Sequence, residues 1–331
     1  MDSVRQGAAN ITAVSKPMYL EALFKVVPVI LLLLLGYLLG QRNFFSPSTL
    51  RELKKLVVNV TLPAALFLAF ARVSLEPRLL IIPVVIFSAC LIVLVASRRW
   101  VPAAWTERRY FPYMMTGFEA GMLGYAIFGT VYGQENLYKF GLVDLGQVTF
   151  VFFILVPALQ REVSGAQRFV TTIRSFFQTP VILAILGGVL LNQSGLYDRT
   201  SGQAWYGTLE TTLQLLGGMT TPLVALIIGA ELRLQLAGLS KPVRTVLLRL
   251  LVWVPAGLLF SLGVVGPLLG LDRVYQAAVM TMAILPPPFV IPLFMKNASK
   301  EETVYVVNTL SLFTLVTLGA FVLVSLVLPP G

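Results

Sequence analysis

The chain has 331 residues, of which 57% are apolar and 12% charged, with a formal net charge of +10 and a mean hydropathy of +0.83. A soluble domain is roughly 45 to 50% apolar and about 25% charged, so this composition excludes a single water-soluble core. The apolar residues suffice for about nine or ten membrane helices of roughly 20 residues each, which excludes a large soluble catalytic or nucleic-acid-binding domain. The cations are spread between apolar runs, so they indicate membrane topology and no nucleic-acid partner.

Cysteine and histidine usage narrows the chemistry further. Cys90 is the one cysteine, it lies inside an apolar run, and histidine is absent. The chain therefore has no disulfide framework and no Cys-based metal site, and it lacks the commonest zinc ligand and general base. We expect no metal, no cofactor and no enzymatic activity. The first 17 residues are polar and lead straight into a run of spanning length, which argues against a cleavable signal peptide.

Apolar runs bounded by charges, Pro and Gly predict ten membrane spans. In chain order the predicted spans are residues 17–39, 53–70, 79–96, 109–132, 137–159, 170–191, 209–230, 246–269, 274–294 and 304–328. The expected fold is an all-α polytopic membrane protein of ten transmembrane helices embedded in a lipid bilayer.

The Lys and Arg residues distinguish the two faces of the membrane. Those assigned to loops after odd-numbered spans are Arg42, Arg51, Lys54, Lys55, Arg98, Arg99, Arg108, Arg109, Arg161, Arg168, Arg174, Arg233, Lys241, Arg244, Arg249, Lys296 and Lys300. Those on the opposite face are Arg5, Lys16, Lys25, Arg72, Arg78, Lys139, Arg199 and Arg273. Cations concentrate in cytoplasmic loops, so both termini are predicted to lie outside the cytoplasm, in a plasma (inner) membrane. The glycosylation sequon Asn10-Ile11-Thr12 falls on that outer side.

The two halves of the chain carry matching motifs. Thr61-Leu62-Pro63 in the second span matches Thr220-Thr221-Pro222 in the seventh, and the two prolines stand 159 positions apart. Arg109 and Arg273, before the fourth and ninth spans, are a second pair, 164 positions apart. Five spans separate the equivalents, and because five is odd the second copy must be inverted. Residues 1–160 and 170–328 are therefore predicted to be two inverted five-helix repeats of one integrated membrane domain.

The fourth and ninth spans are the least suited to a continuous helix. The fourth contains Gly117, Gly121, Gly124 and Gly129, and the ninth contains Pro286-Pro287-Pro288 and Pro292. Consecutive prolines lack amide donors and clash with the preceding turn, so we expect both spans to be broken. Interrupted segments at matching places in two halves are a pointer to a substrate site in a secondary transporter. The alternative is a pair of kinks that serve packing alone.

Two acids lie where a charge is expensive. Glu119 is in the middle of the fourth span, and Asp144 is in the fifth, with Gln147 one turn later on the same helix face. An acid near the bilayer centre costs about 2.5 kcal/mol or more, so it normally faces a cavity, pairs, or carries a proton. Glu119 is the first functional candidate, with a neutral, hydrogen-bonded structural carboxyl as the alternative. Asp144 is open between an ion-coupling role and pairing with Lys139.

Other polar residues in the spans have mainly structural interpretations. At the repeat offset of 164, Asp144 and Gln147 correspond to Asn308 and Ser311 of the tenth span. Thr61 and Thr221 are expected to bond backbone carbonyls freed by the prolines rather than to contact substrate. Glu231 and Arg233 are expected at the cytoplasmic interface, and Asn59, one turn before Pro63, is a weaker candidate ligand for an ion or substrate.

The order and spacing of short motifs resemble the auxin efflux carrier family of membrane transporters, which includes plant PIN-FORMED proteins and bacterial carriers described as malate or malonate permeases. The resemblance covers nearly the whole chain. Its motifs are Leu35-Gly36-Tyr37-Leu38-Leu39-Gly40, Val57-Val58-Asn59-Val60-Thr61-Leu62-Pro63, Gly121-Met122-Leu123-Gly124, Tyr132-Gly133, Asp144-Leu145-Gly146-Gln147, Thr179-Pro180, Ala184-Ile185-Leu186-Gly187, Pro222-Leu223, Ile228-Gly229-Ala230-Glu231-Leu232 and Leu285-Pro286-Pro287.

This resemblance implies ten helices in two inverted repeats, with the broken fourth and ninth helices crossing near the midplane. It also implies a scaffold part and a transport part that move in an elevator-like alternation, and a small organic anion bound beside the crossing. The positive end of a helix dipole suits such an anion. The candidate substrate-binding residues are Glu119, Ala120, Gly121, Met122, Gly124, Asn59, Pro63, Gln147, Pro222, Pro286, Pro287 and Pro288, and the candidate ion-coupling residues are Glu119 and Asp144.

Two residues depart from the family pattern. The family usually has Asn at the position of Glu119 and Pro at the position of Ala126. Without this proline, glycines alone would have to interrupt the helix of the fourth span. A carboxylate in place of Asn would repel an anionic substrate, so either Glu119 is protonated when substrate binds or the substrate is neutral or cationic.

The function expected from these features is secondary active transport of a small organic anion, auxin-like or a dicarboxylate, with coupling to H⁺ or Na⁺ left open. The alternatives are a carrier of the bile-acid/sodium symporter type and a ligand sensor that moves nothing. An intramembrane aspartyl protease would need two facing acids, which Glu119 and Asp144 could imitate, but no Gly-x-Gly-Asp run is present. A homodimer is compatible with the resemblance, although no dimerisation motif points to one.

Overall fold

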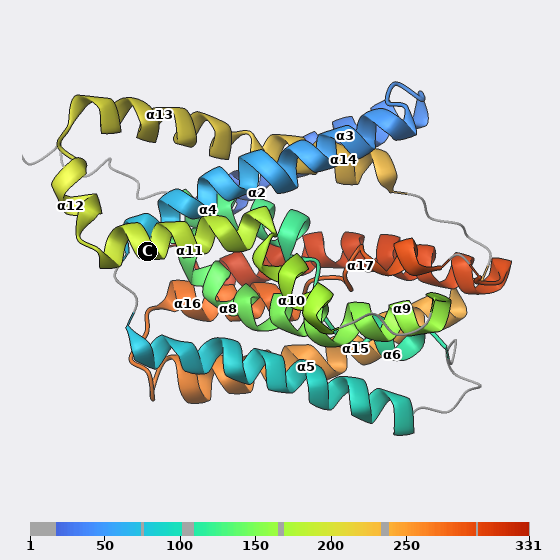
Figure 1. Cartoon of the computed structure of the whole chain (residues 1–331). Helices are drawn as coiled ribbons and strands as arrows, with labels where there is room; N and C mark the ends of the chain where they lie inside the picture. Colours follow the sequence, from blue (N-terminus) through green and yellow to red (C-terminus); the bar gives the residue numbers. More distant parts are fainter. Residues whose placement is uncertain are drawn as a thin grey trace, which may run out of the picture.

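The computed structural model describes residues 18–73, 76–100, 109–164, 169–232, 238–295 and 297–330, and all regular elements in these ranges are helices (Figure 1). Several predicted features lie outside the described residues: the sequon at Asn10 and the cations Arg5, Lys16, Arg108, Arg168, Arg233 and Lys296.

Seven helical stretches in the described ranges are long and apolar enough to cross a membrane. They are Phe24–Gln41, Pro47–Ala71, Pro77–Arg99, Gln134–Arg161, Ala204–Glu231, Ser240–Val265 and Lys300–Val327. The prediction of an all-α, multi-pass membrane protein is therefore confirmed at this level. The predicted fourth, sixth and ninth spans contain shorter helices, so membrane crossing by these three stays a prediction.

The longer stretches are mostly built of several helical pieces. In chain order the pieces are α2 (Met18–Gln41), α3 (Pro47–Leu56), η1 (Val57–Thr61), α4 (Leu62–Ala71), η2 (Pro77–Leu80), α5 (Ile81–Trp100), η4 (Gln134–Asn136), α8 (Leu137–Phe150), η5 (Val151–Leu155), α9 (Val156–Ser164), α13 (Ala204–Gly218), α14 (Thr220–Glu231), α15 (Ser240–Phe260), η6 (Ser261–Val265) and α17 (Lys300–Val327). The short helix α12 (Leu196–Thr200) precedes α13 and lies outside these stretches. The segments η1, η5 and η6 are π-helical turns inside longer helices.

The predicted breaks in the fourth and ninth spans are confirmed. The fourth consists of α6 (Phe111–Met114), a non-helical stretch at 115–119, η3 (Ala120–Gly124) and α7 (Tyr125–Tyr132). The ninth consists of α16 (Arg273–Ala283), a stretch without helix at 284–290 and η7 (Ile291–Phe294). Pro286, Pro287 and Pro288 fill the second gap, as expected from residues that cannot donate to a helix.

The prediction of one continuous sixth span is wrong. The chain there forms α10 (Phe169–Phe177) and, after a break, α11 (Pro180–Gln193). Thr179 is extended, with φ −69° and ψ 124°. A residue before proline is disfavoured in the helical region, so Pro180 ends the first helix and begins the second.

The helices form two packed groups. In one group α2 packs along α14, while α11 and α13 pack on α4; in the other α5 packs on α8, and α15 packs on α16 and α17. Figure 1 shows α13, α14, α2 and α3 along one edge of the molecule, with α5 and α15 along the opposite edge. The interrupted segment that ends in α7 lies between the groups, because α7 contacts α2 and α14 as well as α8 and α16.

Glycines allow the backbones of α2 and α14 to touch. A Cβ atom built on Gly229 would collide with the carbonyl of Leu33 and lie 2.9 Å from the amide nitrogen of Tyr37. One built on Gly40 would lie 2.6 Å from the carbonyl oxygen of Ala230. Small residues at such contacts are typical of helix packing in membranes, where no hydrophobic force drives the helices together.

We expect Gly229→Ala to lower the melting temperature of the purified protein, because overpacking costs about 1 to 3 kcal/mol. The matched control is Gly319→Ala in α17, where a new Cβ would meet nothing within 4 Å. That control gains helix propensity of about 0.5 to 1 kcal/mol and should be neutral or stabilising. Equal melting temperatures for the two variants would contradict the close α2–α14 contact.

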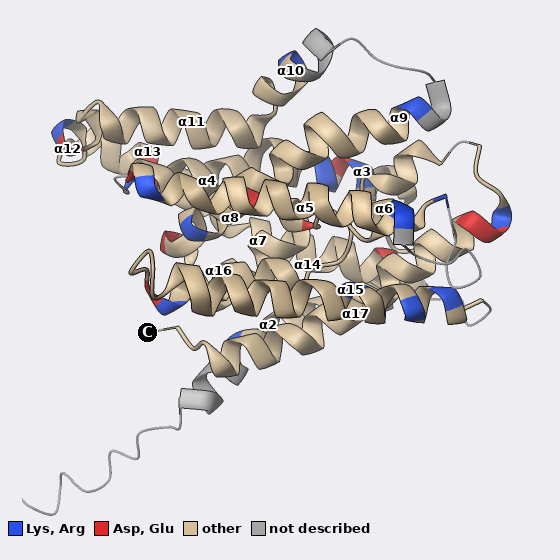
Figure 2. Ribbon diagram, turned by 90° about the horizontal axis from the view of Figure 1, so that it is seen from below, with Lys and Arg blue, Asp and Glu red and all other residues tan. Residues whose placement is uncertain are grey.

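Charges lie mainly at the two ends of the helices (Figure 2). The end that carries α3 holds the ion pair between Lys54 and Glu231, whose charged atoms are 2.6 Å apart. The opposite end carries α12 and the chain's C-terminal residues. The interior is mostly uncharged, which is the pattern of a protein whose middle faces hydrocarbon.

Candidate functional site

The two interrupted segments meet at their breaks. The amide N–H of Glu119 donates to the carbonyl oxygen of Pro286 over 2.9 Å. Gly117, two residues earlier, adopts a left-handed φ of +65°, and a Cβ there would lie 2.8 Å from Cγ of Pro288. The two breaks are therefore in direct backbone contact, and the first of them depends on a residue without a side chain.

The carboxylate of Glu119 joins the two segments a second time. Its Oε1 accepts from the amide of Met122 at 3.2 Å, and its Oε2 accepts from the amide of Phe289 at 2.6 Å. The first amide belongs to the start of η3, and the second is the first backbone donor after three prolines. Amides at a helix start carry partial positive charge. Glu119 is thus a buried carboxylate held by donors from both broken segments.

We call the place where the two breaks touch the crossing, and Asp144 and Gln147 support it from α8. Gln147 accepts from the amide of Phe118 at 3.1 Å and donates to Oδ1 of Asp144 at 2.8 Å. The other oxygen of Asp144 accepts from the hydroxyl of Tyr125 at 2.9 Å. Both polar ends of the Gln147 side chain are therefore engaged within the protein, and Asp144 is satisfied by neutral donors.

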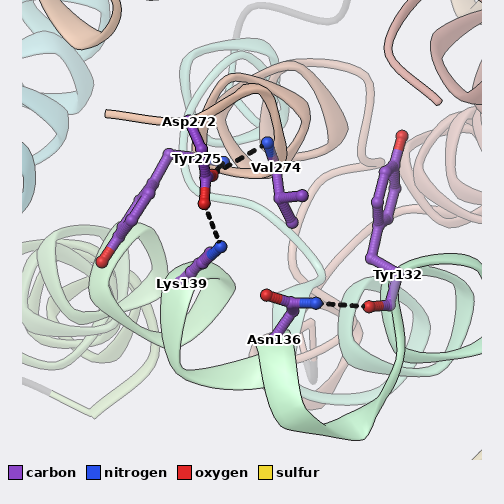
Figure 3. A network of polar contacts seen from close by, with 6 residues as sticks. All are labelled: Tyr132, Asn136, Lys139, Asp272, Val274 and Tyr275. Carbon is purple, nitrogen blue, oxygen red and sulfur yellow. Dashed lines mark hydrogen bonds and ion pairs between the residues drawn. The ribbon is translucent and has the colours of Figure 1, made fainter. Parts of the chain in front are cut away.

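Lys139 does not pair with Asp144, so that expectation is wrong. Its Nζ lies 2.5 Å from Oδ2 of Asp272, the residue that caps α16 through the amides of Val274 and Tyr275 (Figure 3). The ammonium also lies 5.2 Å from the ring centroid of Tyr275. Lys139 stands five residues before Asp144 on α8, so the two side chains do not share a helix face, and the start of α16 supplies the carboxylate instead.

This Lys139–Asp272 pair closes the end of the molecule that holds the C-terminus. Nearby, Asn136 donates to the carbonyl of Tyr132 at 2.7 Å (Figure 3), and the hydroxyl of Tyr132 donates to the carbonyl of Leu328 at 2.8 Å. The pair links α8 with α16, and Tyr132 links α7 with the end of α17. Polar contacts therefore join four elements at this end.

We expect Asp272→Asn to lower the free energy of unfolding by about 1 to 3 kcal/mol, because it leaves a buried ammonium without its carboxylate. The Lys139 side chain is 8% exposed, and Asn still caps a helix, so loss of the ion pair is isolated from loss of the cap. The control is Glu52→Gln, which breaks the Lys55–Glu52 pair, where both side chains are about two-thirds exposed. That pair should contribute almost nothing. Equal thermal stability of both variants would show that the buried pair is not stabilising.

A cavity of about 450 Å³ opens at the other end, beside the crossing. Its walls come from the end of α2, from α3, from the end of α14, from the second break and from α17. The lining residues are Gly40, Asn43, Phe45, Pro47, Leu50, Arg51, Lys54, Ile228, Ala230, Glu231, Leu232, Phe289, Pro292, Leu293, Val307, Leu310, Ser311 and Thr314. Because the amide of Phe289 donates to Glu119, the carboxylate lies directly behind this wall. The volume suits a small organic molecule.

The other candidate residues are distributed unevenly around this cavity. Ala120, Met122 and Gly124 are buried within the crossing, whereas a Cβ on Gly121 would meet open space. Asn59 and Pro222 are exposed, Pro63 is half-buried, and none of the three lines the cavity. The structure therefore groups the fourth- and ninth-span candidates, whereas η1 and α14, which carry Asn59 and Pro222, contact η3 without placing these two residues on the cavity wall.

The threonines beside the matched prolines bond backbone carbonyls, but not the ones that the prolines free at Asn59 and Gly218. Thr61 donates to the carbonyl of Val57 at 3.5 Å, and Thr221 donates to the carbonyl of Ala126 at 3.3 Å. Thr220 also donates to the hydroxyl of Thr61 at 3.0 Å. These bonds engage the hydroxyls of Thr61 and Thr221 within the protein, and their structural role stays a prediction. Glu231 is at the mouth of the cavity, paired with Lys54 as an interfacial acid.

One residue was misassigned from the sequence. The sequence places Arg249 among the cations of the cytoplasmic loops, but in the structure it is fully buried and donates to carbonyl oxygens at both breaks. Four residues later on α15, Trp253 donates to the carbonyl of Met115 at 2.8 Å. The sequence does contain evidence of this role, because Arg249 stands inside an apolar run, where burying a cation costs as much free energy as burying an acid.

Helices long enough to span a bilayer, two interrupted segments that meet inside it and a buried acid between them are the features of an integral, multi-pass membrane transporter. The chain belongs to the membrane transport protein family, the auxin efflux carrier family that its motifs resemble, which matches residues 22–322.

Two relatives show the extent of the likeness. The chain is 28% identical to an "Uncharacterized transporter" of Methanothermobacter thermautotrophicus over 217 residues, which are 63% of this chain and 68% of that protein. It is 29% identical to the "Uncharacterized transporter YfdV" of Escherichia coli K12 over 140 residues, 40% of this chain and 42% of YfdV. Both relatives are described as transporters, which agrees with the family to which the chain belongs.

Proposed function

We propose that the protein is a secondary active transporter of a small organic anion, auxin-like or a dicarboxylate, coupled to protons through Glu119. The observation that carries this proposal is the position of the Glu119 carboxylate. It accepts from amides of both interrupted segments and lies behind the wall of a cavity large enough for such a substrate.

The two amides that hold Glu119 are the donors that an anionic substrate would use. The amide of Met122 lies in the first turn of η3, where backbone N–H groups bind carboxylates and phosphates. The amide of Phe289 lies in the turn before η7. In the described state, the protein's own carboxylate occupies them. Two carboxylates at this place would repel each other, so binding of an anion favours protonation of Glu119 and release of the amides of Met122 and Phe289. Substrate and proton would then move together.

Cationic residues at the mouth of the cavity support an anionic substrate. Arg51 and Lys54 both line it, and the single carboxylate among its lining residues, that of Glu231, is paired with Lys54. Arg51 is exposed and has no carboxylate partner within the described part of the chain. Clefts lined by one sign of charge raise the local concentration of the opposite ion.

We further propose ten transmembrane helices in two inverted repeats, residues 1–160 and 170–328. The bond between Thr61 and Thr220 supports this arrangement, because these residues are 159 positions apart, the same offset as the matched prolines. Residues on a two-fold axis contact their own equivalents. The group built on α2, α4, α11, α13 and α14 would be the scaffold, and the group built on α5, α8, α15, α16 and α17 would carry the substrate in an elevator movement.

The cavity lies at the end of the molecule assigned to the cytoplasm, so the described state would be inward-facing, with both termini outside. A protease-accessible tag at either terminus should report the outside of intact cells. A cytoplasmic signal would overturn this orientation and with it the inward-facing assignment.

The test of function is charge movement on solid-supported membranes that carry the reconstituted protein. Indole-3-acetate, malate, malonate and a bile acid would each be applied at two pH values. A substrate-dependent current that grows at low outer pH supports proton-coupled transport. Ligand binding that raises the melting temperature, without current and without isotope flux, would identify a sensor and overturn the transport proposal.

A further inference from the structure

A buried arginine, Arg249, bonds the free carbonyl groups of the two interrupted segments. The guanidinium of Arg249 donates to the carbonyl oxygens of Met114 at 3.0 Å, Gly117 at 2.5 Å and Leu285 at 3.3 Å. The first two belong to the break after α6, and the third belongs to the break after α16. One side chain of α15 therefore bonds carbonyls of both interrupted segments, whereas Glu119 bonds their amides.

Arg249 has no counter-ion of the ordinary kind. Its side chain is fully buried, and within the described residues no carboxylate lies at ion-pair distance and its Nε has no acceptor. Its charge is compensated by carbonyl dipoles and by two rings. The guanidinium carbon lies 4.8 Å from the ring centroid of Phe118 and 5.5 Å from that of Phe313.

Carbonyl groups at the end of a helix carry partial negative charge and attract cations. In transporters with discontinuous helices, unwound carbonyls and half-helix C-terminal ends coordinate the coupling Na⁺. The neighbouring carbonyls of this crossing are already used, since Trp253 bonds that of Met115 and Thr317 bonds that of Ile284 at 2.6 Å. Three further carbonyls, those of Met114, Gly117 and Leu285, converge on Arg249.

We propose that the carbonyls of Met114, Gly117 and Leu285 form a cation site that Arg249 fills permanently, so that the guanidinium stands where a coupled carrier would bind Na⁺. The inference that transport is independent of Na⁺ rests on the proposed transport function, but the cation site itself does not. Glu119 accepts from the backbone amides at the crossing, and Arg249 donates to the backbone carbonyls there. The chain's own charged side chains therefore bond both kinds of backbone group.

Arginine suits this site better than lysine does. Its planar, forked donors reach carbonyls from two separate segments, and its flat faces stack on aromatic rings, which an ammonium on a flexible stem cannot reproduce. Removal of the side chain should leave a cavity lined by carbonyls and two rings, shaped for a guanidinium ion.

The experiment is chemical rescue of Arg249→Ala. Guanidinium chloride, at concentrations far below those that denature proteins, should raise the melting temperature of this variant by about 2 °C or more relative to KCl at equal ionic strength. The wild type should show no rise. The matched control is Arg72→Ala, which removes a guanidinium paired with Glu210 at 2.6 Å; that site is part-exposed, so no rescue is expected. Absence of selective rescue in a folded Arg249→Ala protein would overturn the proposal.

A second measurement uses the wild type and needs no variant to fold. NaCl, KCl and N-methylglucamine chloride should give equal melting temperatures and, where a substrate current exists, equal currents. A stabilisation or current specific to Na⁺ would show a metal site that Arg249 does not fill, and would overturn the proposal. Guanidinium rescue without any substrate flux would support the cation site while rejecting the transport function.

Discussion

Proteoliposomes that carry Glu119→Gln are expected to lose pH-driven uptake of substrate, while the purified protein stays folded in detergent. The carboxylate joins the two breaks through the amides of Met122 and Phe289. The glutamine side chain keeps one oxygen acceptor for one of these backbone amides. It cannot exchange a proton, and it turns an NH₂ group toward the other backbone N–H. Losing one such hydrogen bond costs about 1 to 3 kcal/mol, a loss that a protein of this size can tolerate.

The control for this variant is Glu231→Gln. That carboxylate also contacts the proposed substrate path, but it is part-exposed and paired with Lys54 at the mouth of the cavity. It should alter the apparent affinity for an anion by a few fold and leave the pH dependence in place. Normal pH-driven uptake by Glu119→Gln would assign Glu119 a purely structural role and remove proton coupling from the proposal.

Gly117→Ala is expected to have the largest effect among the glycine variants. Gly117 has a φ of +65°, and a Cβ there would lie 2.8 Å from Cγ of Pro288 and 3.3 Å from Cγ2 of Val151. The left-handed conformation costs roughly 1 to 2 kcal/mol for a residue with a side chain, and crowding in a close-packed core adds about 1 to 3 kcal/mol. The backbone contact between the two breaks should weaken, and transport should fall at least tenfold.

Gly121→Ala is the matched control, four residues further along the same segment. A Cβ at Gly121 would meet nothing within 4 Å, so the melting temperature should stay within about 1 °C of the wild type. Thermal unfolding in detergent would be measured on both variants, and initial rates of uptake on Gly117→Ala and the wild type. Equal losses for Gly117→Ala and Gly121→Ala would contradict the strained geometry of the first break.

Glu119 and Arg249 illustrate how far the sequence predicts a site. Glu119 was identified because an acid inside an apolar run is expensive, and that cost depends only on the residue and its immediate surroundings. Arg249 carries the same signal, but it also fits the count of loop cations, and the positive-inside rule does not distinguish a cation near a span's end from one folded into it. Only the packing of α15 against both breaks separates the two interpretations.

The all-helical membrane class, the approximate positions of the longer spans and the two breaks were determined by the sequence alone. Each follows from local chemistry: apolar length, charge placement, and prolines or glycines that cannot continue a helix. The sixth span shows the limit of such prediction, because its apolar run is predicted as one span, whereas the helix is interrupted before Pro180.

The partners of the charged residues were decided by the tertiary structure. Glu119 is bonded to an amide 170 positions away, and Lys139 is paired with an acid 133 positions away. No local rule predicts such partners, because a buried charge binds whichever opposite charge or dipole the packing of distant helices brings to it. Hydrophobic pattern and helix breakers therefore specify which segments enter the membrane, whereas the arrangement of those segments specifies what each buried charge can do.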